Sequence, residues 1–451
     1  MITFDRVLPE LIRACREDAG SQDAVVRYCI VRDVRGRVRL VIELKKDSKI
    51  ALKDLQETLT KTLGEYFVAP IVFAATDGEM KRLAEKILEQ AKAKWPAGWP
   101  HSVRNVLGGA DTLIGAGELW TGIERTIGKE AWLTTTPPEP PWPLIKGKTP
   151  PIVTFHSFKG GVGRTTLVAA YAILLASRTP PLRVAVVDLD LEAPGIGSLL
   201  EAKTARGVLD VLVDHIATGV LDLDGASTLA QVDGAVDRNI TVFPAGRVDD
   251  VYVQKLARLD FSSTEPGKDN PVGMALTAML KSMRANFDVI LLDSRAGLHD
   301  LAGMSLHGLA HVDVLVFRGT TQNFAGLTQT LRTLGSRDDT QLVLVETLLP
   351  GNEEELFKLR RERTRLYVYE MLCEHVYAED NPPQLGDVGE PHDVVPVRRR
   401  EWLDGLDSMK DHVADVLKEG ELKEVARRID EECLLDPEGA TDAMRNDEDA
   451  Q

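Results

Sequence analysis

Residues 152–166 read IVTFHSFKGGVGRTT, a run that joins an apolar segment, a glycine-rich turn and the start of a helix. Its first four residues are all β-branched or aromatic, which is typical of a buried strand. Gly160, Gly161 and Gly163 lie in the turn, where the lack of a Cβ lets backbone N–H groups converge on an anion. The helix expected to begin near Thr165 adds the positive end of its dipole. The run therefore predicts a loop that binds phosphate.

The spacing of this loop extends the prediction to a nucleoside triphosphate with magnesium. Thr165 occupies the position whose hydroxyl ligates Mg²⁺ in such loops, and Thr166 can reach the α-phosphate. We expect contacts with the nucleotide from eight consecutive residues: Lys159, Gly160, Gly161, Val162, Gly163, Arg164, Thr165 and Thr166.

Two further segments place carboxylates beside the loop. The run RVAVVDLD ends in Asp188 and Asp190, and FDVILLDSRAG contains Asp293 at the end of an apolar strand. The carboxyl ends of parallel strands form the edge at which open α/β sheets bind ligands. We predict that Asp188 and Asp293 support magnesium, and that Asp190, which lies beyond its strand, orients the attacking water.

A proline-rich segment divides the chain at residues 134–151, which read TTTPPEPPWPLIKGKTPP. This density of proline excludes helix and favours an extended linker. Residues 1–133 are expected to form a small α+β domain that serves as a partner or effector module. Its predicted elements are a helix at 9–19, a hairpin around 33–36, a helix at 50–66, a strand at 68–75 and a helix at 77–95.

Past the linker, short apolar runs alternate with helical stretches, which predicts a doubly wound, mostly parallel α/β sheet over residues 152–433, with helices at its C-terminal end. The last residues, 434–451, are acidic and polar and are expected to be disordered. The runs expected to be strands are Ile152–Phe155, Arg183–Asp188, Ile240–Pro244, Val289–Asp293, Val314–Phe317 and Leu342–Glu346.

Composition restricts where the chain works and what it binds. Its four cysteines have no C-x-x-C spacing, and no signal peptide or apolar run long enough to span a membrane is present, so we expect a cytoplasmic protein with no membrane attachment. A net charge of −16 argues against binding to nucleic acid unless a local basic patch exists. Arg398–Arg400, with arginines at 360–365, is one candidate patch, although a solvated helix face explains it as well.

These motifs resemble the ParA/MinD branch of P-loop ATPases, which has a deviant Walker A motif with a second lysine at its start. Lys159 matches that lysine, and the resemblance implies that it reaches the phosphates of a partner across an ATP-sandwiched homodimer. The segment with Asp188 and Asp190 is similar to switch I, and Asp293–Gly297 is similar to Walker B and switch II. The resemblance covers roughly residues 151–400.

A closer resemblance is to a bacterial subgroup whose motif reads SFKGGVGRT and whose switch II reads DSR followed by a glycine. This chain carries both, at Ser157–Thr165 and Asp293–Gly297. The resemblance implies an ATPase module and an association with bacterial conflict or phage-defence systems.

The chain departs from the usual pattern at two places. Arg164 replaces the lysine that contacts the β- and γ-phosphates, and its planar fork differs from a compact ammonium, so hydrolysis is expected to be slow. Relatives commonly carry an asparagine that reads adenine where this chain has VLVETLLP, and Glu346 or Thr347 is the candidate substitute.

The resulting hypothesis is an ATP hydrolase with ATP and Mg²⁺ as cofactors, in which Lys159, Asp190 and Arg164 are catalytic. Nucleotide-dependent homodimerisation would control a protein partner or the N-terminal domain. Two alternatives remain: an ATP sensor that hydrolyses negligibly, and a ParA-like protein that positions cargo on DNA. Arg295, in the predicted switch II, is a second candidate for contact with the γ-phosphate or a dimer partner, or for an ion pair.

Overall fold

The computed structural model divides into two units, one ending at Thr135 and the other beginning at Thr136, apart from residues 264–267, which lie outside the described part. The structure describes residues 2–18, 24–45, 52–73, 79–90, 99, 119–125, 128–133, 139–232, 236–259, 270–335, 341–351, 353–378, 381–403 and 405–435. In this part of the chain, no helix is both long and apolar enough to cross a membrane.

The N-terminal unit contains a four-stranded sheet in the order β3-β2-β1-β4. The predicted hairpin is confirmed: β1 (Val25–Arg32) and β2 (Val38–Leu44) pair antiparallel around a turn in which Gly36 has φ of 81°. β3 (Val72–Phe73) and β4 (Trp120–Glu124) add in parallel at the two edges. The sequence did not predict β4.

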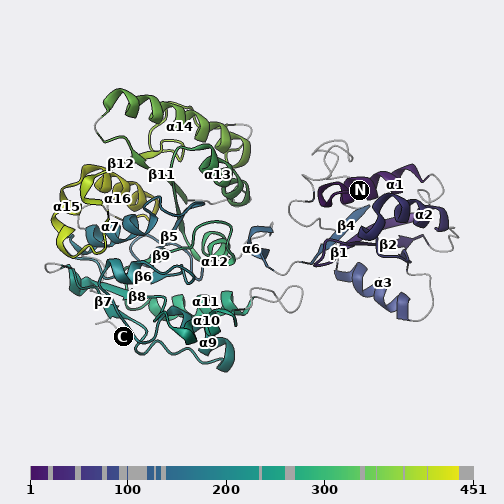
Figure 1. Ribbon diagram of the computed structural model, residues 1–451, viewed down its shortest axis with the longest axis horizontal. Coiled ribbons are helices and arrows are strands. Elements are labelled where there is room, and N and C mark those ends of the chain that lie inside the picture. The colour runs from purple at the N-terminus through teal and green to yellow at the C-terminus, as the bar shows by residue number, and fades with distance from the viewer. Residues whose placement is uncertain are drawn as a thin grey trace. The chain divides into compact units, whose positions relative to one another are not determined.

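Helices cover both faces of this sheet (Figure 1). α1 (Phe4–Glu17) and α2 (Lys53–Leu63) pack their leucines and isoleucines on one face, and α3 (Glu79–Gln90) covers the other. A short helix, α6 (Glu130–Leu133), follows β4. The apolar side chains of α1 and α2 recur at helical spacing, so each helix has one apolar face, and these faces pack on the sheet as a core.

The C-terminal unit is built on an eight-stranded sheet in the order β12-β11-β10-β5-β9-β6-β8-β7. All neighbouring strands are parallel except β7, which runs antiparallel to β8. This confirms the predicted doubly wound sheet. The strands are β5 (Ile152–His156), β6 (Val184–Asp188), β7 (Thr228–Leu229), β8 (Ile240–Phe243), β9 (Val289–Asp293), β10 (Val312–Phe317), β11 (Gln341–Leu349) and β12 (Val395–Arg398).

Two strands were not predicted. β7 has only two residues, and β12 reads VPVR, which is too short and too polar to stand out as a buried strand. Both lie at an edge of the sheet, where a strand needs a partner on one side only. The six strands between them follow the predicted runs to within a few residues.

The helices lie on both faces of this sheet, as Figure 1 shows. One apolar cluster joins one face to α7 (Arg164–Ala176), α15 (Val413–Lys418) and α16 (Gly420–Glu432). α7 reads RTTLVAAYAILLA and is buried along most of its length because it packs on the sheet beside these C-terminal helices. The opposite cluster contains residues of α9 (Val208–Thr218), α10 (Asp250–Leu256), α11 (Pro271–Met283) and α12 (Asp300–Met304).

Further helices are α8 (Ile196–Leu199), α13 (Thr321–Leu334) and α14 (Glu354–His375). The predicted C-terminal helices are present as α15 and α16. The tail expected to be disordered is residues 434–451, and 436–451 of these lie outside the described part of the chain.

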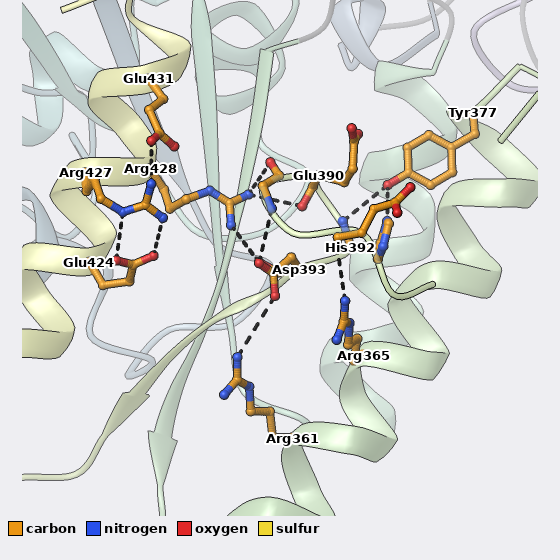
Figure 2. A network of polar contacts seen from close by, with 12 residues as sticks. Arg361, Arg365, Tyr377, Glu390, His392, Asp393, Glu424, Arg427, Arg428 and Glu431 are labelled. Carbon is orange, nitrogen blue, oxygen red and sulfur yellow. Dashed lines mark hydrogen bonds and ion pairs between the residues drawn. The ribbon is translucent and has the colours of Figure 1, made fainter. Parts of the chain in front are cut away.

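Arg428 on α16 fastens the loop between α14 and β12 (Figure 2). Its side chain is 3% exposed, and its two terminal nitrogens donate to the backbone oxygens of Gly389, Glu390 and Asp393 and to the Asp393 carboxylate at 2.7–3.3 Å. Arg361 of α14 lies 4.0 Å from the same carboxylate. The loop is thereby tied to both helices.

The candidate basic patch is largely engaged in ion pairs. Arg398 contacts Glu354 and Glu421, and Arg400 makes two hydrogen bonds to Glu419 at 2.8 and 2.9 Å. These contacts favour the structural interpretation of the Arg398–Arg400 run.

Candidate nucleotide-binding site

The predicted phosphate loop lies between β5 and α7. Gly161 and Gly163 have φ of 72° and 81°, a region that strongly favours glycine. A Cβ placed on Gly160, Gly161 or Gly163 would meet no atom within 4 Å, so the inner side of the loop is open. Within the described residues, the backbone N–H groups of these three glycines make no hydrogen bond. Unpaired N–H groups beside a helix N-terminus form an anion cradle.

Three contacts hold the loop from outside. Gly297 donates its N–H to Ser157 O at 2.9 Å, and Thr347 donates its hydroxyl to Val162 O at 2.6 Å. The ring of Phe158 lies over Gly326 of α13, where a Cβ would approach its Cγ to 1.8 Å. The loop is therefore held by the segment after β9, by β11 and by α13, as well as by its own glycines.

Arg164, the first residue of α7, turns into the site. Its guanidinium is 8% exposed; Nε donates to Asp293 Oδ1 at 2.7 Å and Nη2 to Asp190 Oδ2 at 2.9 Å. Burial alone would lower the pKa of Arg164, but the charges of Asp293 and Asp190 outweigh it and raise that pKa. Arg164 therefore contacts two of the three carboxylates that were predicted to lie beside the loop.

The three predicted carboxylates meet at the carboxyl ends of β6 and β9, where Asp188 and Asp293 are register partners. Burial, and then the charge of Asp293, raise the pKa of Asp188 well above its ordinary value. Burial also raises the pKa of Asp293, although Arg164 opposes this. Burial therefore favours the protonated form of both carboxyl groups, and a cation bound beside them would favour the ionised form.

The free oxygen atoms of this cluster indicate where a metal fits. Asp190 Oδ1 and Asp293 Oδ2 are buried and have no hydrogen-bond partner. No group of three or more His, Cys, Asp or Glu residues that could hold a metal exists in the described ranges. Magnesium commonly takes one or two carboxylates and completes its octahedron with phosphate and water oxygens, which this donor set, together with the half-buried Thr165, would allow.

Asp188 has a different environment. Its Oδ1 accepts from Asp190 N at 3.1 Å and its Oδ2 from Gly195 N at 3.3 Å, and its side chain is fully buried. The structure thus shows Asp188 fixing the turn after β6. Its predicted contribution to a metal site stays a prediction.

Lys159 lies on the exposed side of the loop, with its ammonium 5.5 Å from the centroid of the Phe158 ring. The exposed position leaves it free to move, and its predicted role toward a partner stays a prediction. Thr166 is half-buried in the first turn of α7.

Arg295 forms an ion pair, which is one of the alternatives that the sequence left open for it. Its Nη1 contacts Glu192 Oε1, and His299 Nε2 lies 3.1 Å from the same oxygen. Hydrogen bonding by Arg295 lowers the pKa of Glu192. Because His299 Nδ1 accepts from Leu301 N, its Nε2 carries the proton and donates. The segments after β6 and β9 are therefore joined directly.

The candidate base-reading residues face inward. Thr347 is 4% exposed and donates to the phosphate loop, and Glu346 is 3% exposed and accepts from the hydroxyl of Thr364 at 3.0 Å. Burial raises the pKa of Glu346 to about 7. The sequence suggested Glu346 and Thr347 for base recognition. It did not predict their hydrogen bonds to Thr364 and Val162, because these join segments that are far apart in the chain.

Comparisons with known proteins gave structural neighbours only; no family model matches, and no curated protein matches by sequence. MinD from Pyrococcus horikoshii OT3, the septum site-determining protein complexed with Mg-ADP, is 19% identical with a TM-score of 0.41, over 62% of this chain and 95% of MinD. The pNOB8 ParA is 20% identical with a TM-score of 0.42, over 62% and 99% of the two chains. The same ParA bound to nonspecific DNA gives a TM-score of 0.39 at 20% identity, again over 62% and 99%.

Proposed function

We propose that this chain binds ATP with magnesium at residues 159–166 and hydrolyses it, using the bound nucleotide to switch its association state. The observation that carries this proposal is the meeting, at one edge of the sheet, of three unpaired glycine N–H groups with two carboxylates that keep a free oxygen. An anion cradle next to free carboxylate oxygens suits a polyphosphate with a hard cation.

The residues divide the work as follows. The glycines and the N-terminus of α7 would bind the phosphates, and Thr165 with the free oxygen of Asp293 would hold magnesium. Bound magnesium would neutralise charge on the transferred phosphoryl group. Asp190 Oδ1 would orient the attacking water while Arg164 fixes the other oxygen of the same carboxylate.

Dimerisation is the proposed output. Lys159 is exposed at the mouth of the loop, where it can reach a second copy of the chain. The dimer would act on the N-terminal unit or on a protein partner in the cytoplasm, and we extend the proposal to a bacterial conflict or phage-defence module.

The test combines mass and turnover. Light scattering with ATP and magnesium, against ADP, should show a doubling of mass, and Asp190→Ala should lower phosphate release about 100-fold or more. Asp288→Ala is the matched control because Asp288 also pairs with an arginine next to β9, but it precedes the strand and lies at the opposite end of it. Constant mass and no phosphate release in the wild type would contradict the switch.

A non-hydrolysing sensor is the second candidate. It is favoured by the direction of Arg164, whose Nε and one terminal nitrogen both contact carboxylates and so are not presented to a phosphate. Tight binding of ATP without phosphate release would identify it.

A further inference from the structure

Arg164 joins two carboxylates that come from different segments. Asp293 is the last residue of β9, whereas Asp190 lies in the turn after β6. The bonds use Nε for Asp293 and Nη2 for Asp190, at 2.7 and 2.9 Å, so one guanidinium bridges the gap. Each carboxylate keeps one buried oxygen without a partner.

A lysine cannot reproduce this arrangement. The guanidinium presents its donors in a rigid plane, so that separate nitrogens address separate carboxylates at the same time. An ammonium on a shorter, flexible stem concentrates its charge at one atom. With lysine at this position, at least one buried carboxylate would lose its close cation, and a buried charge without a partner is strongly unfavourable.

We propose that Arg164 is a built-in cationic clamp that holds Asp190 beside Asp293 without a metal, so that nucleotide binding depends less on magnesium than it would with lysine. This inference rests on the proposed function for its nucleotide part only. The clamp supplies one positive charge between two carboxylates, which is part of what a divalent cation supplies in such a site. Magnesium would then add to a site already assembled.

Magnesium dependence of binding is the first test. We would titrate N-methylanthraniloyl-ADP, followed by its fluorescence, into the wild type and Arg164→Lys, with magnesium or with EDTA. Removal of magnesium should weaken binding to Arg164→Lys by at least about tenfold more than binding to the wild type, a difference of about 1.4 kcal/mol. An equal loss in both would overturn the proposal.

Arg178→Lys serves as the matched control. Arg178 is also a largely buried arginine paired with an aspartate, Asp430. Arg178 follows the C-terminal end of α7 and Asp430 belongs to α16, so both lie away from the phosphate loop. Its substitution should leave the magnesium dependence at the wild-type value. A change as large as that of Arg164→Lys would mean that general loosening of the unit explains the result, which also overturns the clamp.

A second test needs no nucleotide and separates the clamp from the proposed function. If the probe binds to none of the variants, the proposed function fails, and the clamp is still measured by urea unfolding of Arg164→Met, Asp190→Ala and the double variant. A clamp makes the two shifts of the unfolding midpoint strongly non-additive, because either change alone breaks the same bond. Additive shifts would overturn it.

Discussion

Two arginines of the C-terminal unit are buried to a similar degree yet have opposite surroundings. Arg428 is 3% exposed and donates mainly to backbone oxygens of one loop, whereas Arg164 is 8% exposed and donates to two carboxylates (Figure 2 for Arg428). A backbone oxygen carries no net charge and needs no further cation. The carboxylates beside Arg164 keep buried free oxygens.

A structural arginine can thus be told from one in a ligand site by the acceptors around it. Around Arg428 the acceptors receive hydrogen bonds from the arginine, and the Asp393 carboxylate lies between two arginines, Arg361 and Arg428. Around Arg164 acceptor capacity remains, in a cluster where burial raises the pKa of Asp188 and of Asp293. Leftover buried acceptors carry a cost in free energy, which a ligand or metal can remove.

The largest expected effect is the loss of Arg428. Arg428→Met leaves three backbone oxygens and the Asp393 carboxylate without this donor, and should lower the free energy of unfolding of the C-terminal unit by about 3–5 kcal/mol. Urea denaturation followed by far-UV circular dichroism measures this. Arg427→Met is the control: Arg427, next to Arg428 on the same helix, pairs with Glu424 and Glu431 at the surface, and its loss should cost less than about 1 kcal/mol. Equal costs would contradict the structural role of Arg428.

Glu346 connects the two regions, because it lies on β11 beside the phosphate loop and accepts from Thr364 of α14, the helix that carries Arg361. Burial raises its pKa from 4.5 to about 7, so the folded chain binds its proton more tightly than the unfolded chain does. Wild-type stability therefore falls as pH rises from about 4.5 to about 7, whereas Glu346→Gln lacks this contribution to the slope. We expect the variant to be more stable by about 1–3 kcal/mol at pH 8 and to lose the advantage near pH 4. Urea midpoints across this pH range measure the effect, and parallel curves would refute it.

Arg164→Met should cost less stability than Arg428→Met, about 1–2 kcal/mol, because Asp293 can take up a proton when its cation is lost. Binding of the fluorescent nucleotide should nevertheless weaken by about tenfold or more. Measuring both quantities on the two variants sharpens the comparison: Arg428→Met should lose stability and keep its affinity for nucleotide at temperatures where it stays folded. The reverse pattern would mean that the two clusters are misassigned.

The smallest effect is expected at the support of the loop. Thr347→Val removes the hydroxyl that donates to Val162 O and should cost about 1 kcal/mol, while weakening nucleotide binding severalfold. Thr330→Val is its control, since Thr330 is also buried but donates within α13, to Gly326 O at 3.0 Å. Calorimetric titration with ADP should show weaker binding for Thr347→Val alone.

The sequence predicted the doubly wound sheet and the phosphate loop because both depend on local information. Apolar, β-branched runs identify parallel strands without knowledge of their neighbours, and the glycines of the loop follow one another directly. The common edge of Asp188 and Asp293 also followed, since parallel strands end on the same side. The edge strand β12 did not, because its four residues carry too weak a pattern.

Sequence alone was enough to predict the six central strands of the C-terminal unit and the residues at the carboxyl edge of its sheet, but not the strands β4, β7 and β12. Only the tertiary structure decided that Arg164 turns toward Asp293, 129 residues away, and that Thr347 supports Val162, 185 residues away. It also decided that Glu192 holds Arg295. The physical reason is that strand and turn preferences are set by neighbouring residues, whereas the direction of a long polar side chain is set by whichever partners the packed sheet and helices bring within hydrogen-bonding distance.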